Sequence, residues 1–318
     1  MTAENTYKLE LTTSPHTHSR MSTQKVMWIV VAALVPSVIT GVIYFGLYQL
    51  LIIAISIAFC SGTEALIKVI RKQKIKIKDG SAVITGLLLA LILPPNFSLV
   101  STAFGAIIAI SLGKEVFGGL GYNIFNPALV GRAFLQAAFP VPMTTWTIPN
   151  YAVDATTTAT PLSAFKFDNA LTEISNMFFG NIGGSIGETS AIAILVGGIF
   201  LVVIGISNWR IPLSMILGII IFGGIFYIID PISYPNPLFH LCAGGFLFGA
   251  FFMATDWVTS PLTGKGMWIF GFSISFILVI IRLFGGLPEG VMYAILFMNA
   301  FVPLINRYTR PKIFGVEK

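Results

Sequence analysis

Apolar stretches of close to 20 residues recur along almost the whole chain, with short polar segments between them. A helix needs about 20 apolar residues to cross the hydrocarbon core of a bilayer. Of the 318 residues, 55% are hydrophobic and only 10% are charged, and the mean hydropathy is +0.86. That balance excludes a soluble domain of this length. The sequence therefore predicts an all-α polytopic membrane protein.

We expect about ten transmembrane helices, delimited by the polar residues, glycines and prolines between the apolar runs. The third to fifth are short, because Pro94-Pro95, the glycine-rich 118–121 and Asn126-Pro127 interrupt them. Such backbone is broken or re-entrant only where protein or a cavity surrounds it. The expected spans are 26–46, 48–70, 81–95, 98–113, 126–140, 187–207, 211–229, 238–255, 267–285 and 289–306.

Lysine and arginine are distributed unevenly between the two sides of these spans. With the N-terminus in the cytoplasm, the outer segments hold only Lys166 and, near a helix end, Arg282. This asymmetry predicts that both termini are cytoplasmic and that the one long loop is outside. It also explains the net charge of +6 without a nucleic-acid partner. The inner segments hold Lys8, Arg20, Lys25, the run Arg71 to Lys78, Lys114, Arg210, Lys265, Arg307, Arg310, Lys312 and Lys318.

The long loop divides the chain into two halves of five spans each. Because five is odd, an internal repeat would have inverted topology. Spans three and eight favour such a repeat weakly: both are apolar, contain glycine and end abruptly, at Pro94-Pro95 and at Thr255-Asp256. The expected organisation is a cytoplasmic segment 1–25, a first half 26–140, an outer loop 141–186, a second half 187–306 and a cytoplasmic tail 307–318.

The usual redox and metal ligands are scarce. Cys60 and Cys242 both fall within apolar segments, and two cysteines supply neither the four ligands of an iron–sulfur cluster nor a zinc spacing. We therefore expect no metal site and no catalytic side chain. The first 25 residues lack a short apolar core followed by a cleavage site, so we expect no secretory signal to be removed.

The outer loop contains four threonines within five positions, in the segment Asp154-Ala-Thr-Thr-Thr-Ala-Thr-Pro-Leu162. The composition alone fits a polar linker. A hydroxyl can, however, be esterified to a phosphate, which tethers a phosphorylated cofactor without a metal or a thiol. Pro161 restricts Thr160 to extended geometry, as suits an exposed acceptor.

This segment resembles the flavinylation site of a family that includes the D subunit of the Rnf complex and the B subunit of the Na+-translocating NADH:quinone reductase. The family pattern is an Asp followed by Ser/Thr-Gly-Ala-Thr, and the last threonine carries FMN as a phosphoester. Asp154 matches the Asp, Thr157 the Ser/Thr, Ala159 the Ala and Thr160 the FMN-bearing threonine. Thr158 stands where the family has Gly. Thr157 and Thr158 are the weaker candidate acceptors.

Other motifs extend the resemblance from about residue 14 to the tenth span. Within the last of them Trp257 stands where we expect Pro, and the length without a long N-terminal extension favours the Rnf branch. The matching segments are Ser14-Pro15-His16, Gly121 to Ala128, Gly131 to Phe134, Gly184 to Ser190, Ala254 to Asp256 and Thr259 to Pro261.

The resemblance implies a membrane electron-transfer subunit of an ion-translocating ferredoxin:NAD+ oxidoreductase, a translocase in which this chain is not catalytic alone. FMN on Thr160 would accept electrons outside, from the covalent FMN of the G subunit. A noncovalent flavin of riboflavin type within the helix bundle would carry them inward. The implied partners are the A, B, C, E and G subunits of the Rnf complex, a flavin transferase and the lipid of a bacterial or archaeal cytoplasmic membrane.

A second hypothesis is a channel or transporter for a small neutral solute. Inverted five-helix halves with discontinuous helices suit midplane binding, and the family's fold is related to that of urea transporters. The sequence does not decide between Na+ and H+. For Arg132 and Asp256, anchoring at a helix end and a flavin or ion role both stay open. Glu188 is expected to cap span six, and His240 to be a hydrogen-bonded interface residue.

Overall fold

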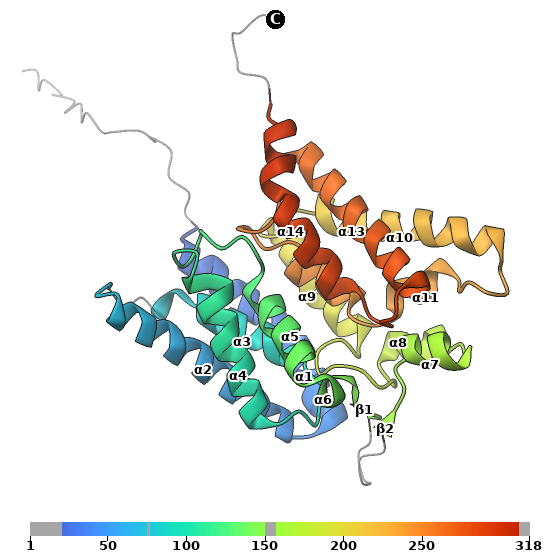
Figure 1. The fold of residues 1–318 in the computed structure, drawn as a ribbon, viewed down its shortest axis with the longest axis horizontal. Helices are drawn as coiled ribbons and strands as arrows, with labels where there is room; N and C mark the ends of the chain where they lie inside the picture. Colours follow the sequence, from blue (N-terminus) through green and yellow to red (C-terminus); the bar gives the residue numbers. More distant parts are fainter. Residues whose placement is uncertain (1–20, 75–76, 150–156, 312–318) are drawn as a thin grey trace, which may run out of the picture.

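The computed structural model describes residues 21–74, 77–149 and 157–311. It is helical almost throughout, and every expected span contains helix at the expected place (Figure 1). The first half comprises α1 (Thr23–Phe45), α2 (Tyr48–Ile70), the 3-10 turn η1 (Ile77–Asp79), α3 (Ser81–Leu91), α4 (Leu99–Ile110), the π-helical turn η2 (Ser111–Glu115) and α5 (Pro127–Ala138).

The long loop and the second half follow. The loop holds α6 (Pro140–Thr144), β1 (Trp146–Thr147), β2 (Thr157–Thr158), α7 (Pro161–Asp168) and α8 (Ile174–Phe179). The second half comprises α9 (Ala191–Ile204), α10 (Arg210–Ile229), α11 (Pro237–Cys242), α12 (Phe246–Phe248), the π-helical turn η3 (Gly249–Met253), α13 (Gly264–Phe284) and α14 (Val291–Tyr308).

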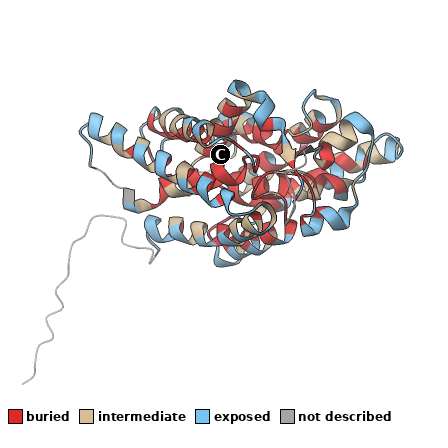
Figure 2. Cartoon of the chain, turned by 90° about the horizontal axis from the view of Figure 1, so that it is seen from below, coloured by how far each residue is buried: buried red, intermediate tan, exposed pale blue. Residues whose placement is uncertain are grey.

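Among the described residues, five helices are long and apolar enough to cross a membrane: α1, α2, α10, α13 and α14. This agrees with the expected polytopic membrane protein, while ten crossings stay a prediction. Large apolar side chains also cover the outside of the bundle, as for Ile228, which is 80% exposed, and Val203, which is 78% exposed. Figure 2 shows this exposed surface around a buried centre. Such a surface fits lipid as the surrounding solvent.

The two halves pack in the same pairwise order. In the first half α2 packs on α4 and α4 on α5, and in the second α10 packs on α13 and α13 on α14. The first helices of the two halves, α1 and α9, pack on each other. At one side of the molecule lie β1, β2, α7 and α8, and α14 ends at the opposite side (Figure 1). We call the first of these the loop side. The second, where α14 ends with Arg307 in its last turn, is the basic side.

Two of the expected spans are broken, and protein groups satisfy the freed backbone. After α3 ends, the carbonyl oxygen of Leu91 accepts from the Gly187 N–H at 2.7 Å, and that of Leu93 accepts from the Ile186 N–H at 3.1 Å. The segment before α9 thus supplies the hydrogen-bond donors that the broken backbone of span three lacks. Unpaired backbone in hydrocarbon costs several kcal/mol per group, so a break survives only with such partners.

The break in span eight lies between α11 and α12. The Arg282 guanidinium donates to the carbonyl oxygens of His240 at 2.6 Å and Ala243 at 2.9 Å. The Gly245 N–H donates to Oε2 of Glu289 at 3.2 Å. At Gly244, φ is +64° and a Cβ would lie 2.0 Å from that same carboxylate oxygen, so only glycine fits here.

Candidate functional site

The threonine segment is held at the loop side by a short ladder and by a helix start. Thr158 pairs with Trp146 and Thr157 with Thr147 in the antiparallel β1–β2 pair. Thr160 then caps α7 in extended geometry, with φ −68° and ψ 158°. The expected effect of Pro161 on Thr160 is confirmed. Asp154 and Thr156 lie outside the described residues.

The hydroxyls of Thr158 and Thr160 have different surroundings. The methyl group of Thr158 packs against Gly183, where an added Cβ would lie 2.4 Å from it. Oγ1 of Thr160 accepts from the Ser163 N–H at 3.2 Å and lies 2.9 Å from Oγ of Ser163. The half-buried Thr158 donates its hydroxyl to the Ala159 oxygen at 3.4 Å, whereas Thr160 stands at the start of a helix. Pro161 has no N–H and the Ser163 and Ala164 N–H groups bond to Thr160, so this helix start favours a bound anion mainly through the positive end of the helix dipole.

Thr160 lies on the wall of a cavity of about 490 Å³, the loop-side cavity. Its volume falls within the range of small-molecule sites, about 300–1,000 Å³. Aromatic and apolar side chains supply much of the wall, and a few polar groups converge on it. The lining residues include Arg132, Gln136, Trp146, Thr158, Thr160, Ser163, Phe167, Gly183, Glu188, Gly244, Glu289, Met292 and Tyr293.

Two charge pairs contribute to this cavity: Arg132 and Glu188 are buried and line it, whereas in the second pair only Glu289, which is 26% exposed, lines it. NH1 of Arg132 lies 3.2 Å from Oε1 of Glu188, and the side chains are 8% and 9% exposed. NH2 of Arg282 lies 3.5 Å from Oε1 of Glu289. Arg132 sits in the middle of α5, so it is not a helix-end anchor facing cytoplasmic water. The four charges cancel, and neither pair leaves a net charge in the site.

The expectation that Glu188 caps span six is wrong. The N-cap of α9 is Ser190, whose side chain accepts from the Ala193 N–H at 3.4 Å. Glu188 instead pairs with Arg132, and the Ser185 hydroxyl donates to its other oxygen. A buried carboxylate needs that partner more than a helix start needs a cap.

His240 is 1% exposed, and no partner lies near its Nδ1 within the described part of the chain. The hydrogen bond at this residue comes instead through its backbone oxygen, which accepts from Arg282. That part of the expectation for His240 is wrong. Nor do any three His, Cys, Asp or Glu side chains in residues 21–74, 77–149 and 157–311 come close enough to hold a metal ion.

Lys166 ties the threonine segment to the second half. Its ammonium group donates to the backbone oxygens of Ile281 at 3.4 Å, Arg282 at 3.1 Å and Leu287 at 3.0 Å. The first two oxygens lie in the last turn of α13, and the third lies in the turn that leads to Glu289. Burial lowers the pKa of the Lys166 ammonium from its ordinary value. The residue thus fixes α7, and with it Thr160, relative to the far wall of the cavity.

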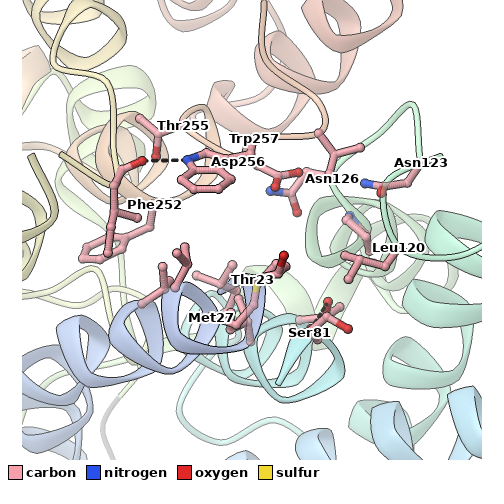
Figure 3. A pocket seen from close by; sticks show the side chains of 18 of the residues that line it. Thr23, Met27, Ser81, Leu120, Asn123, Asn126, Phe252, Thr255, Asp256 and Trp257 are labelled. Atoms are coloured by element: carbon pink, nitrogen blue, oxygen red, sulfur yellow. Dashed lines mark hydrogen bonds between the residues drawn. The ribbon is translucent and has the colours of Figure 1, made fainter. Parts of the chain in front are cut away.

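A second cavity, of about 240 Å³, lies at the beginning of α1, which is on the basic side in Figure 1, and Figure 3 shows the residues that line it. Asp256 and Asn126 lie on one wall, opposite Thr23 and Ser81. Asp256 accepts from the Thr259 hydroxyl at 3.0 Å, so it is bonded locally but faces the cavity. We call this the basic-side cavity. Asp256, for which the sequence leaves both anchoring and a flavin or ion role open, therefore lies in a candidate site.

Lys114 also lines the basic-side cavity, which differs from its expected place. The charge pattern puts it in an inner segment, but the helix continues past residue 113 through η2, and Lys114 is only 2% exposed. Its ammonium group pairs with Glu64 of α2, which is fully buried. A glutamate within the apolar span 48–70, six residues before its end, is the signal that could have revealed this pair.

One helix connects the two cavities. Asn126 and Pro127, where α5 begins, line the basic-side cavity, and Arg132 and Gln136 of the same helix line the loop-side cavity. From Pro127 to Gln136 a helix advances about 14 Å, at about 1.5 Å per residue. The two sites are therefore much closer together than the faces of a hydrocarbon core about 30 Å thick.

Comparison with known proteins agrees with the family resemblance. The profile of the NQR2, RnfD, RnfE family matches residues 10–315. The D subunit of the proton-translocating ferredoxin:NAD(+) oxidoreductase complex of Clostridium ljungdahlii is 44% identical, over 97% of this chain and 96% of its own length.

The D subunit of the Na(+)-translocating complex of Acetobacterium woodii is 42% identical, over 99% of this chain and 98% of its own length. The D subunit of an ion-translocating oxidoreductase complex of Actinobacillus succinogenes is 34% identical, over 96% and 98%. These names are those of redox-complex subunits, and they speak against a small-solute channel. The chain belongs to the NQR2, RnfD, RnfE family.

Proposed function

We propose that this chain is the D subunit of an Rnf-type ion-translocating ferredoxin:NAD+ oxidoreductase and carries electrons on FMN bound covalently to Thr160. The observation that carries the proposal is the position of Thr160, on the wall of a cavity of about 490 Å³ and at the start of α7. The threonine motif alone fits a linker. A threonine beside a cavity of ligand size fits an attachment site.

The residues around Thr160 fit FMN. The Ser163 hydroxyl, 2.9 Å from Oγ1 of Thr160, and the positive end of α7 would hold the phosphate, because a hydroxyl donor and a helix N-terminus both favour an anion. Trp146 and Tyr293 line the same cavity and suit an aromatic ring system. When bound, FMN would supply the electron-carrying chemistry, and the protein would supply its orientation and surroundings.

The chain's own charges suit a redox cofactor that changes charge. Arg132 is held by Glu188, and Glu289 by Arg282, so the cavity has fixed dipoles on two walls without a net charge. Groups held in this way need no rearrangement when charge develops beside them. Lys166 holds α7 to the end of α13, which keeps the attachment point at a constant distance from Glu289.

The basic-side cavity is our candidate for the second flavin, a noncovalent one of riboflavin type. Met27, Leu88 and Phe252 provide apolar walls, and Thr23 and Ser207 provide hydroxyls at its edge. That combination suits a flat aromatic ring system that carries a hydroxylated chain. At about 240 Å³ the cavity is smaller than the about 300–1,000 Å³ of most small-molecule sites, so a flavin bound there would widen it. A second carrier at this place divides the passage across the membrane into two shorter steps.

Orientation follows from the lysine and arginine distribution. The basic side would face the cytoplasm, and Thr160 would face outside, where a flavin transferase and the FMN-bearing G subunit can reach it. The repeated packing order of the halves supports two inverted five-helix repeats like those of urea transporters. The coupled ion stays undecided, since relatives at 44% and 42% identity are named for protons and for Na+.

Fluorescence of the denatured chain tests the attachment. The protein is coexpressed with its flavin transferase, separated on a denaturing gel and viewed under ultraviolet light. The wild type and Thr160→Ser should fluoresce, Thr160→Val should be dark, and Thr158→Val, the matched control, should be as bright as wild type. Intact mass should show one FMN phosphoester. A solute channel would give a dark wild-type band, and a bright Thr160→Val band would move the attachment to another residue.

A further inference from the structure

A row of hydrogen-bonding groups leads from the wall of the basic-side cavity to the surface. Nζ of Lys114 lies 2.6 Å from Oγ of Ser81, and both residues line the cavity. The Ser81 hydroxyl donates to Oδ1 of Asp79 at 2.9 Å. Asp79 ends η1, in the loop between α2 and α3, and is half-buried. The row is unbroken from the buried ammonium to the half-exposed carboxylate.

The donors in this row all point the same way. The Lys114 ammonium can only donate, the Ser81 hydroxyl accepts from it and donates onward, and the Asp79 carboxylate only accepts. The Ser81 N–H also donates to Oδ1 of Asp79, at 3.0 Å, which fixes the carboxylate beside the hydroxyl. A serine between a donor and an acceptor can pass a proton by exchanging one O–H bond for another.

Glu64 holds the inner end of the row in position. Its Oε2 lies 2.6 Å from Nζ of Lys114, and its Oε1 pairs with Lys68, whose side chain is 13% exposed. If Lys114 had only a structural role, the pair with Glu64 would satisfy its charge. The additional contact with Ser81 and the place on the cavity wall give the ammonium a route to the surface on one side and to a ligand on the other.

We propose that Lys114, Ser81 and Asp79 form a proton relay between the basic-side surface and a ligand in the basic-side cavity, with Glu64 as the positioning residue. The relay rests on the proposed second flavin, because a flavin takes up protons when it is reduced. In one passage, an N–H bond of Lys114 breaks as the ligand gains that proton. Asp79 takes up a proton from water, and both hydrogen bonds then reverse from the direction found in the structure, so that Asp79 donates to Ser81 and Ser81 donates to the neutral lysine. The Ser81 proton passes to the lysine, and the Asp79 proton passes to Ser81.

The test measures proton uptake by the full chain purified in detergent with riboflavin added as the probe. Quenching of riboflavin fluorescence first establishes binding and the saturating concentration. Methyl viologen radical generated by a light flash then supplies electrons and no protons, so every proton taken up comes from water. A pH-indicator dye in weak buffer follows the uptake, while the flavin absorbance follows reduction.

Asp79→Asn is the decisive variant, because it keeps a hydrogen-bond acceptor, lies outside the cavity wall and loses only the titratable group. Proton uptake should slow by about 10²-fold in Asp79→Asn and in Ser81→Ala, the lower end of what a positioned acid or base contributes. Ser81→Thr should restore it. Ser56→Ala is the matched control: its hydroxyl donates to Gly86 of the same helix α3, at 2.7 Å, outside the row.

Each outcome separates the relay from the flavin assignment. Riboflavin binding with slow uptake only in Asp79→Asn and Ser81→Ala supports the relay. Binding in all variants with wild-type uptake in Asp79→Asn overturns the relay and leaves the second flavin in place. If the wild-type chain does not quench riboflavin, both the second flavin and the relay are wrong, while the covalent FMN on Thr160 is untouched.

Discussion

Among single residues, the adjacent glycines Gly183 and Gly184 differ in how closely they contact other side chains. An added Cβ at Gly183 would lie 2.4 Å from the Thr158 methyl group, whereas one at Gly184 would lie at an ordinary 3.5 Å from Thr189. Gly183→Ala should therefore displace β2 and reduce flavinylation severalfold, and overpacking costs about 1–3 kcal/mol. Gly184→Ala should flavinylate as wild type. Gel fluorescence per unit of protein is the measurement, and equal brightness of both variants would contradict the idea.

The buried pair of Arg132 and Glu188 makes a second prediction at this scale. Arg132→Met leaves the Glu188 carboxylate buried without its partner and should lower the free energy of unfolding by about 3–5 kcal/mol. The double variant Arg132→Met with Glu188→Met should recover most of that loss, because no unpaired charge remains. Thermal unfolding in detergent measures both. A double variant as unstable as the single one would show that the unpaired charge is not the cause of the lost stability.

At the scale of elements, the apolar runs set the helices well, because each run has to cover the hydrocarbon core. The helices α2 and α10 begin and end within a residue of the expected spans. The exact break in span eight was not predictable. It depends on Arg282 and Glu289, about 40 residues further along, which satisfy the freed backbone of Ala243 and Gly245.

The candidate site divides in the same way. Its proposed attachment residue could be chosen from a local motif, since Thr160 and Pro161 are neighbours. The pairing of Arg132 with Glu188 joins residues 56 apart in sequence, and that of Lys114 with Glu64 joins residues 50 apart. In a hydropathy pattern such charged residues only interrupt an apolar run, and the pattern does not show which residue pairs with them. Their partners emerge only from the packing of α5 on the loop before α9 and of α2 on η2.

The attachment of α7 to α13 is a prediction for an element. Lys166→Met removes three charge-assisted bonds to backbone oxygens and should loosen α7 from the end of α13. We expect faster proteolysis within 157–168 and a free energy of unfolding lower by about 1.5–3 kcal/mol, as for a hydrogen bond to a charged group. Arg210→Met, a basic-side cation outside this contact, is the control. Unchanged cleavage in Lys166→Met would mean that apolar packing alone holds α7.

At the scale of the whole molecule, orientation is open to direct test. Phe167 on the loop side is 67% exposed, and Lys72 on the basic side is exposed as well. In intact cells a membrane-impermeant thiol reagent should label Phe167→Cys and should label Lys72→Cys only after permeabilisation. Both variants are made with Cys60 and Cys242 replaced by Ala. Labelling of Lys72→Cys in intact cells would reverse the orientation.

The break in span three also has a consequence for biosynthesis. Its carbonyls at Leu91 and Leu93 bond to N–H groups of Ile186 and Gly187, which the ribosome makes about 90 residues later. Until that stretch arrives, the newly inserted N-terminal helices carry two unsatisfied oxygens at membrane depth. A chain stopped before residue 185 should therefore be a substrate for membrane quality control, and supplying the missing portion as a separate polypeptide should rescue it.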